Sequence, residues 1–169
     1  YTLTVNAIND NPAAADDVAS GDEDDDVSGD VSANDSDLDA TNGDDSPPEH
    51  FTLHYAVDDN SGPWNGLVAM ADDGSYTYTP NQHWNGTDSF TYTVSDEAGG
   101  SDGATVTITV NDINDNPVAD AGEDQGPYTA TFANNYEIEV ELDGSGSSDI
   151  DGTIVTYNWS EDNIGIGSG

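Results

Sequence analysis

The sequence contains no lysine and no arginine among its 169 residues, although 36 of them are aspartate or glutamate. The formal net charge at pH 7 is therefore −36. A chain without basic side chains cannot neutralise phosphate groups, which excludes electrostatic binding to nucleic acid or to anionic lipid. The charge that balances these carboxylates must come from solvent or from bound metal ions. Such a net charge keeps a protein soluble where salt screens the repulsion, which suits a saline, extracellular or halophilic setting.

Cysteine is also absent, so no disulfide can stabilise the fold. The sequence has no apolar run long enough to span a membrane, and we expect no direct membrane insertion. We see no signal peptide, and the chain begins without Met inside a strand-like run, so we expect a window of a longer protein. High net charge and low hydrophobicity also characterise disordered chains. The aromatic residues and the alternating Thr/Val runs favour a folded chain instead.

Alternating apolar and polar residues predict short β-strands. The pattern occurs at 51–57, 76–79, 90–94 and 105–110. The pair Asp73-Gly74 is a turn signal, so residues 67–79 are predicted to form a hairpin. The acidic segments 16–26 and 35–45 are predicted to be loops or edge segments. No stretch shows helical periodicity of useful length. The fold class predicted is all-β, with tandem immunoglobulin-like antiparallel β-sandwich modules.

One segment of the sequence is repeated. Residues 2–12 read TLTVNAINDNP and residues 107–117 read TITVNDINDNP, a spacing of 105 residues that suits one sandwich module. We therefore expect residues 1–10 to be the last strand and linker of a preceding module. Residues 11–111 would form one β-sandwich, 112–117 a linker, and 118–169 an incomplete second sandwich. Its strand candidates are TATF, YEIEVEL and TIVTYNW.

The linker Asp112-Ile113-Asn114-Asp115-Asn116-Pro117 is rich in oxygen ligands. Calcium takes six to eight oxygens from carboxylates, amides, backbone carbonyls and water. Pro117 holds the exit of the linker extended. The spelling resembles the calcium-binding linker of cadherins, in which the residues matching Asp112, Asn114, Asp115 and Asn116 bind ions that lock successive modules together. The alternative is an Asn/Asp-rich turn that binds nothing.

Further candidate metal ligands occur elsewhere in the chain. The earlier copy of the linker has Ala7 in place of Asp112, so its site would be weaker. The segment 35–46 does not match an EF-hand loop, because Ala40 and Ser46 replace its Gly and Glu. We therefore expect either a looser calcium site or a solvated loop. The candidates are Asn9, Asp10 and Asn11 in the first linker copy, the D-x-D-x-D residues Asp35, Asp37 and Asp39, the strand-end pair Asp96 and Glu97, and Asp149 and Asp151 in S-D-I-D-G.

Longer segments resemble known families. VSGDVSANDSDLD (27–39), DGSYTYTPNQHWNGTDSFTYTVSD (73–96) and TVTITVND (105–112) are similar to the cadherin-like and VCBS-type repeats of bacterial surface adhesins. That resemblance implies extracellular stalks, dependence on Ca²⁺ and sometimes adhesion. PVADAGEDQ (117–125) and LDGSGSSDIDGTIVTYNWS (142–160) resemble the start of a PKD domain. PKD modules are β-sandwiches of surface layers and secreted hydrolases.

The remaining motifs do not indicate catalysis. The sequence has no G-x-S-x-G, phosphate loop or H-E-x-x-H, so we expect no enzyme. His50 and His54 are expected to be exposed and unliganded, and His83 to pack beside Trp84. Trp64, Trp84 and Trp159 either pack in a core or linker or stack on sugars. Asn34, Asn85 and Asn158 are sequons for glycosylation or chance matches.

The function predicted is a calcium-rigidified spacer of a large secreted or cell-surface protein, either an adhesin stalk or an extracellular filament. Its partners would be neighbouring modules of the same chain or neighbouring subunits, and possibly surface polysaccharide. One alternative is a carbohydrate-binding accessory module of a secreted hydrolase. Another is a polymer subunit in which a strand from one chain completes the sandwich of the next.

Overall fold

The computed structural model describes residues 1, 8–38, 52–123, 141–161 and 164–168. The chain divides into two compact units, Tyr1–Ile113 and Asn114–Gly169, and each is described by itself. The predicted ligand Asp39, the segment TATF and most of YEIEVEL lie outside the described residues. Among the described residues, no helix has the length and apolar character needed to cross a membrane.

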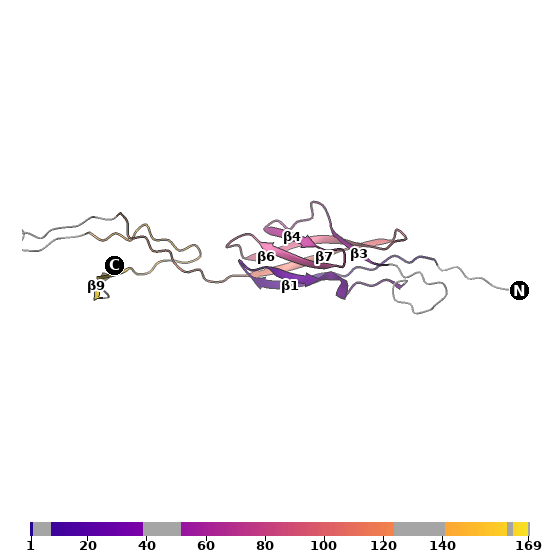
Figure 1. The fold of residues 1–169 in the computed structure, drawn as a ribbon, viewed down its shortest axis with the longest axis horizontal. Coiled ribbons are helices and arrows are strands. Elements are labelled where there is room, and N and C mark those ends of the chain that lie inside the picture. The colour runs from indigo at the N-terminus through magenta and orange to yellow at the C-terminus, as the bar shows by residue number, and fades with distance from the viewer. Residues whose placement is uncertain (2–7, 39–51, 124–140, 162–163, 169) are drawn as a thin grey trace, which may run out of the picture. The chain divides into compact units, whose positions relative to one another are not determined.

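The first unit is a β-sandwich of two sheets (Figure 1). One sheet has the strand order β1-β7-β6-β3 and the other has the order β2-β5-β4. The elements are β1 (Asp17–Asp22), β2 (Val27–Asp30), the 3₁₀ turn η1 (Val31–Ala33), β3 (His54–Val57), β4 (Gly66–Met70), β5 (Ser75–Pro80), β6 (Gly86–Ser95) and β7 (Ser101–Asn111). The prediction of an all-β sandwich is confirmed.

The predicted hairpin is formed by β4 and β5, which pair antiparallel from Gly66 opposite Pro80 to Met70 opposite Tyr76. Its turn contains Gly74, whose φ of 90° lies in the region that favours glycine. The Asp73 carboxylate accepts hydrogen bonds from the Ser75 amide at 3.1 Å and the Ser75 hydroxyl at 2.7 Å. The Asp-Gly signal therefore locates the turn correctly, because both residues are needed for its geometry.

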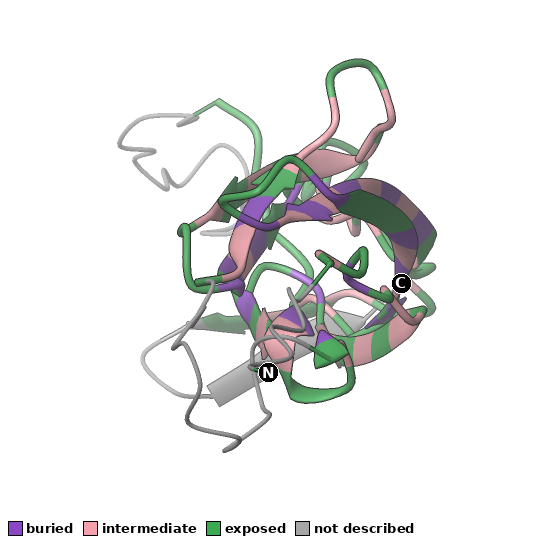
Figure 2. Ribbon diagram, turned by 90° about the vertical axis from the view of Figure 1, so that its right-hand side faces the viewer, coloured by how far each residue is buried: buried purple, intermediate pink, exposed green. Residues whose placement is uncertain are grey.

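The core lies between the two sheets and comes from the alternation of β5, β6 and β7. Buried positions alternate with more exposed ones along these strands (Figure 2). Tyr76 packs edge-on against Phe90, with ring centroids 5.4 Å apart. The fully buried side chains are Tyr78, Tyr92, Phe90, Ile108, Val31, Val94 and Val106. Tyrosines fill much of this core, so their hydroxyls must find acceptors inside the protein.

Strand β1 is an edge strand that pairs parallel to β7, with Asp17 opposite Val106 and Asp22 opposite Asn111. The other strand pairs of the first unit are antiparallel. Carboxylates flank the pairing: Asp16 accepts a hydrogen bond from the Thr105 amide at 2.9 Å, and Asp22 accepts one from the Asn111 side chain at 3.0 Å. The segment 16–26 thus includes an edge strand, which was one of its two predicted states.

In the second unit, β8 (Asn158–Glu161) pairs antiparallel with β9 (Ile164–Ser168). An isolated bridge joins Val118 and Ser148. The predicted strand TIVTYNW is wrong for residues 153–157, because the strand begins only at Asn158. Among the described residues no segment forms a ladder with 153–157, and an alternating pattern makes a strand only where a partner supplies hydrogen bonds.

Candidate metal centre

Strand directions gather acidic residues at the two ends of the first sandwich. β1 and β7 run parallel while β6 runs antiparallel to β7. The segment before β1 therefore meets the β6–β7 turn at one end, which we call the entry end (residues 9–16, 35–37 and 96–102). The segment after β7 leaves at the exit end (residues 22–24, 83–86 and 111–113), close to the start of β6.

Asp96 organises the entry end. It follows β6 and is buried. Its Oδ1 accepts hydrogen bonds from the amides of Ala98 at 2.9 Å and Gly100 at 2.7 Å, and its Oδ2 accepts one from Asn9 Nδ2 at 2.9 Å. The bond from Asn9, together with the backbone amides, lowers the pKa of Asp96 below its usual value. These hydrogen bonds therefore favour the anionic form of Asp96 over the protonated form.

Three oxygen-bearing side chains converge on this turn. Asn9 Oδ1 is buried and accepts no hydrogen bond from the described residues. A side chain on Gly100 would collide with Asp96 Oδ2 and come within 2.9 Å of Asn11 Oδ1, so both oxygens lie over this glycine. Amide and carboxylate oxygens are the ligands that calcium takes. The donor set of Asn9, Asn11 and Asp96 fits a calcium ion whose remaining ligands are water or other oxygens.

Of the other predicted ligands of the first unit, Asp112 lies at the exit end and the remaining described ones lie at the entry end. Asp35 Oδ1 accepts a hydrogen bond from the Ala15 amide at 2.8 Å, and Ser36 forms a backbone bridge with Ala13. Asp37 is buried, with 3% of its surface exposed. Asp10 and Glu97 are exposed. Sequence segments far apart are thus brought to one end, although their roles as metal ligands stay predictions.

Asp35 and Asp17 share the hydroxyl group of Tyr92. The sequence did not identify Asp17 or Tyr92 as part of a site. Tyr92 OH lies 3.0 Å from Asp35 Oδ2 and 3.2 Å from Asp17 Oδ2. Burial raises the pKa of Asp17, the Tyr92 bond opposes this rise, and the charge of Asp35 adds to it. The two carboxylates therefore repel each other across one phenol.

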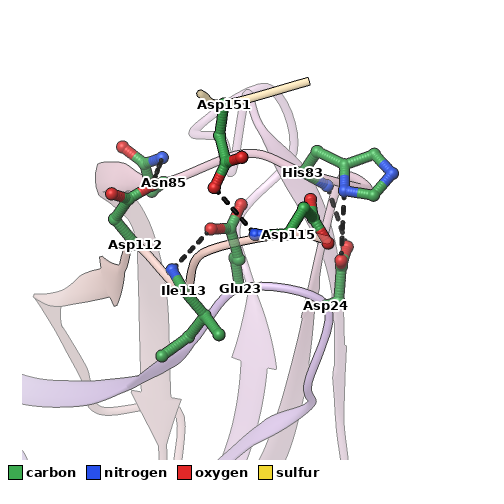
Figure 3. A network of polar contacts seen from close by, with 8 residues as sticks. All are labelled: Glu23, Asp24, His83, Asn85, Asp112, Ile113, Asp115 and Asp151. Atoms are coloured by element: carbon green, nitrogen blue, oxygen red, sulfur yellow. Dashed lines mark hydrogen bonds and ion pairs between the residues drawn. The ribbon is translucent and has the colours of Figure 1, made fainter. Parts of the chain in front are cut away.

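The exit end is built around Glu23, which is buried with 7% of its surface exposed. Glu23 Oε1 accepts a hydrogen bond from the Ile113 amide at 2.7 Å (Figure 3). Asp112, the first residue of the predicted linker, accepts one from Asn85 Nδ2 at 2.8 Å. The start of the linker is thus fixed to the sandwich by a carboxylate and an amide that the sequence did not identify as ligands.

The sequence predicted that His83 packs beside Trp84, and the structure adds polar contacts to Asp24. Its backbone amide donates to Asp24 Oδ1 at 2.8 Å, and its Nδ1 lies 3.3 Å from Asp24 Oδ2. His54 also has a polar partner, since its Nδ1 lies 2.7 Å from Asp72 Oδ2. In a chain with no lysine or arginine, histidines are the side chains that can pair with carboxylates as cations.

In the second unit, the predicted ligands Asp115 and Asp151 meet. The Asp115 amide donates to Asp151 Oδ2 at 2.9 Å (Figure 3), and Asn114 Nδ2 donates to the Asp115 carbonyl at 2.7 Å. Asn116 is exposed. Asp149 lies against Gly152, and its Oδ1 is buried without a hydrogen bond from the described residues.

Sequence reasoning missed Asp17, Glu23, Asp24, Asn85 and Tyr92 as parts of these ends. The acidic run 16–26 signalled the presence of carboxylates but not which of them turn inward. Glu23 is distinguished only by its burial beside exposed neighbours, which depends on the path of the chain after β1.

The comparison with family models identifies the first unit. The model of the bacterial cadherin-like domain matches residues 9–112, more than half of the chain. The chain belongs to this family. Bacterial cadherin-like domains are typically non-catalytic modules of extracellular or surface-exposed proteins, with a structural or adhesive role. The match includes the entry end and all of the exit end except Ile113.

Two solved structures are similar at low identity. A nucleoside hydrolase-related hypothetical protein from Saccharophagus degradans, associated with carbohydrate metabolism, has 16% identity and a TM-score of 0.44. The alignment covers 61% of this chain but only 26% of that protein. The PKD domain of the KIAA 1837 protein has 21% identity and a TM-score of 0.38, with 75% of this chain and 99% of that domain covered. No curated protein matches the chain.

Proposed function

We propose that this chain is a calcium-stiffened structural segment of a large extracellular or cell-surface protein, such as an adhesin stalk or a surface filament. Membership of the bacterial cadherin-like family supports the structural role. The observation that supports calcium binding is the buried Asn9 Oδ1, which accepts no hydrogen bond from the described residues. This oxygen lies in the same group of ligands as the side-chain oxygens of Asn11 and Asp96.

The physical mechanism is electrostatic. Two carboxylates 4 Å apart repel by about 1 kcal/mol in water and by more where they are partly buried. A divalent cation replaces this repulsion with coordination, and the chain supplies no lysine or arginine to do so. At the entry end the ion would connect the linker residues Asn9 and Asn11 to Asp96. In the second linker copy the calcium ligands would be Asp112, Asn114, Asp115 and Asn116. Extracellular calcium modules bind with dissociation constants of about 0.1–1 mM.

Neighbouring modules of the same chain, or neighbouring subunits, are the partners that this role requires. We also propose that residues 118–169 begin a PKD-like sandwich, which the motifs PVADAGEDQ and SGSSDIDGT support. A sandwich completed by a strand from a neighbouring subunit is the alternative form of assembly.

Calcium binding is tested by calorimetric titration of the whole chain and by its melting temperature. Asn9→Ala removes the Oδ1 ligand and should lower calcium affinity at one site, because no described side chain replaces that oxygen. Gln82→Ala removes an exposed amide from another segment and should leave that site unchanged. A wild-type chain that releases no heat with millimolar calcium, and melts at one temperature with calcium or chelator, contradicts the proposal.

Stiffening is a separate claim with its own measurement. Small-angle scattering of the whole chain should give a larger and more uniform maximum dimension in calcium than in chelator, because bound ions restrict the linker. Magnesium at the same concentration is the control, since it prefers a small octahedral site and keeps its waters. Identical scattering curves in calcium and chelator would leave a calcium-binding protein that calcium does not stiffen.

A further inference from the structure

The loop between β3 and β4 (residues 58–65) is held firmly against β6 by two carboxylates. Asp58 accepts hydrogen bonds from the hydroxyls of Thr91 at 2.7 Å and Thr93 at 2.6 Å. Asp88 is buried, with 4% of its surface exposed. It accepts bonds from the amides of Trp64 at 3.1 Å and Asn65 at 2.7 Å.

Both carboxylate oxygens of Asp88 accept hydrogen bonds. Besides the loop amides it accepts a hydrogen bond from the buried Tyr78 hydroxyl at 3.1 Å and one from the Ser89 amide at 2.9 Å. A buried carboxylate is costly unless it is well satisfied. Here its donors come from the loop and from the core, so it fixes the backbone of the loop to the interior.

The side chain that this loop carries is exposed. Trp64 has 75% of its surface accessible, and Leu67, at the start of β4, has 76%. The sequence left Trp64 open between packing and sugar stacking, and its exposure excludes packing in the core. Trp84, by contrast, packs against the core. A large aromatic ring on a fixed backbone binds a partner at low entropic cost.

The stretch from Asn60 to Thr87, which includes Trp64, is poor in acidic residues for this chain, although Asp58 and the exposed Asp59 precede it in the same loop. Between Asn60 and Thr87 the acidic residues are Asp72 and Asp73, which lie in the turn between β4 and β5. The strands β4 and β5 contain none, although the chain as a whole carries 36.

We propose that Trp64, held by Asp88, is a stacking site for a sugar ring of a neutral polysaccharide. The apolar C–H face of a pyranose ring covers an indole, while its hydroxyls stay in water or bond to neutral amides. Asn60 and Asn65 lie in the same loop and carry such amides.

Charge selects this class of partner over others. A second copy of the chain and an acidic polysaccharide both carry negative charge toward a protein with a net charge of −36. A basic partner would gain more from the acidic ends than from the neutral strands β4 and β5. A neutral glycan meets neither difficulty, so only its contact with the indole decides the affinity.

The test is electrophoresis of the whole chain in native gels that contain soluble neutral polysaccharides, namely xyloglucan, galactomannan and laminarin, with alginate as the acidic comparison. At least one neutral polysaccharide should retard the wild type, and alginate should not. Trp64→Ala should raise the dissociation constant about tenfold or more. Trp64→Phe keeps a ring and should lose less.

Two controls separate stacking from general effects. Val18→Ala removes another exposed apolar side chain, and Trp159→Ala removes a tryptophan of the second unit. Both should be retarded like the wild type, and thermal melts should show that every variant is folded. Asp88→Asn keeps the size of the side chain but removes the charge that accepts hydrogen bonds from the loop amides. The indole of Trp64 is still present in this variant, but its backbone is held less firmly, so retardation should be weaker.

Other results overturn the proposal. They are no retardation by any of the neutral polysaccharides, equal retardation of wild type and Trp64→Ala, or stronger retardation by alginate. Sedimentation that shows a dimer lost in Trp64→Ala would instead assign this surface to a second copy.

Discussion

Tyr92 places one phenolic proton among several acceptor oxygens. The carboxylates of Asp17 and Asp35 and the Ala15 carbonyl all lie within 3.2 Å of its hydroxyl oxygen. Burial raises the pKa of Tyr92 far above its usual value, and the two aspartates raise it further. Tyr78 is in a similar state, because burial and Asp88 raise the pKa of its hydroxyl.

These tyrosines predict how the protein unfolds in alkali. Burial also raises the pKa of Tyr55 to about 12. A raised folded-state pKa contributes stability that is complete below the unfolded value of about 10 and is lost as pH rises through the folded pKa. We therefore expect stability to fall above about pH 10. Absorbance at 295 nm and circular dichroism should change together. Ionisation of all eight tyrosines near pH 10 in a folded protein would contradict this.

The pair Asp17 and Asp35 predicts a stabilising substitution. Asp17→Asn removes one of the two charges, and its free energy of unfolding at pH 7 should rise by up to about 1 kcal/mol. Because the pKa of Asp17 is raised, the wild-type residue is already protonated in acid, so the gain should disappear as pH falls below that pKa. Urea unfolding of the wild type and the variant, at pH 7 and at a pH below the pKa of Asp17, measures the difference in free energy of unfolding.

The matched control for that substitution is Asp25→Asn, which removes an exposed carboxylate from the turn after β1. It reports the general benefit of lowering the net charge. An equal gain in both variants would mean that the contact with Asp35 and Tyr92 has no specific effect.

At the scale of the element, the β6–β7 turn brings side-chain oxygens together over Gly100. Asp96 holds the turn through the amides of Ala98 and Gly100, while its second oxygen faces Asn9. The absence of a side chain at Gly100 leaves room for Asp96 Oδ2 and Asn11 Oδ1. A larger residue would displace the oxygens that are proposed to bind calcium.

Gly100→Ala should therefore weaken calcium binding at the entry end by about tenfold, equivalent to about 1.4 kcal/mol. Gly103→Ala is the control, because a Cβ there meets only the Tyr92 carbonyl oxygen at 3.3 Å. Calorimetric titration measures both. Unchanged affinity in a folded Gly100→Ala chain would show that the oxygens over this glycine do not bind the ion.

At the scale of the whole molecule, the net charge of −36 opposes compaction. Raising the ionic strength from about 0.01 to 1 M shortens the Debye length from about 30 to about 3 Å. The melting temperature should rise over this range as repulsion is screened. Calcium at millimolar concentration should raise it further than sodium chloride of equal ionic strength, since coordination is specific. A melting temperature that is independent of salt would show that self-repulsion does not limit stability.

The sequence alone predicted the features that depend on neighbouring residues. The alternation at 76–79, 90–94 and 105–110 predicted the strands β5, β6 and β7, and Asp73-Gly74 predicted the hairpin of β5 with β4. Both signals are local, because they depend on side-chain period and turn chemistry. The absence of basic residues and the repeat of the linker were likewise found from the sequence alone.

Only the tertiary structure decided which polar groups meet. Asn9 and Asp96 lie 87 positions apart, and Glu23 reaches Ile113 across 90, so no local pattern could pair them. The parallel pairing of β1 with β7 and the late start of β8 at Asn158 were equally hidden. A strand's period is written in its own residues, whereas its partners, and the burial of a single carboxylate, follow from the path of the whole chain.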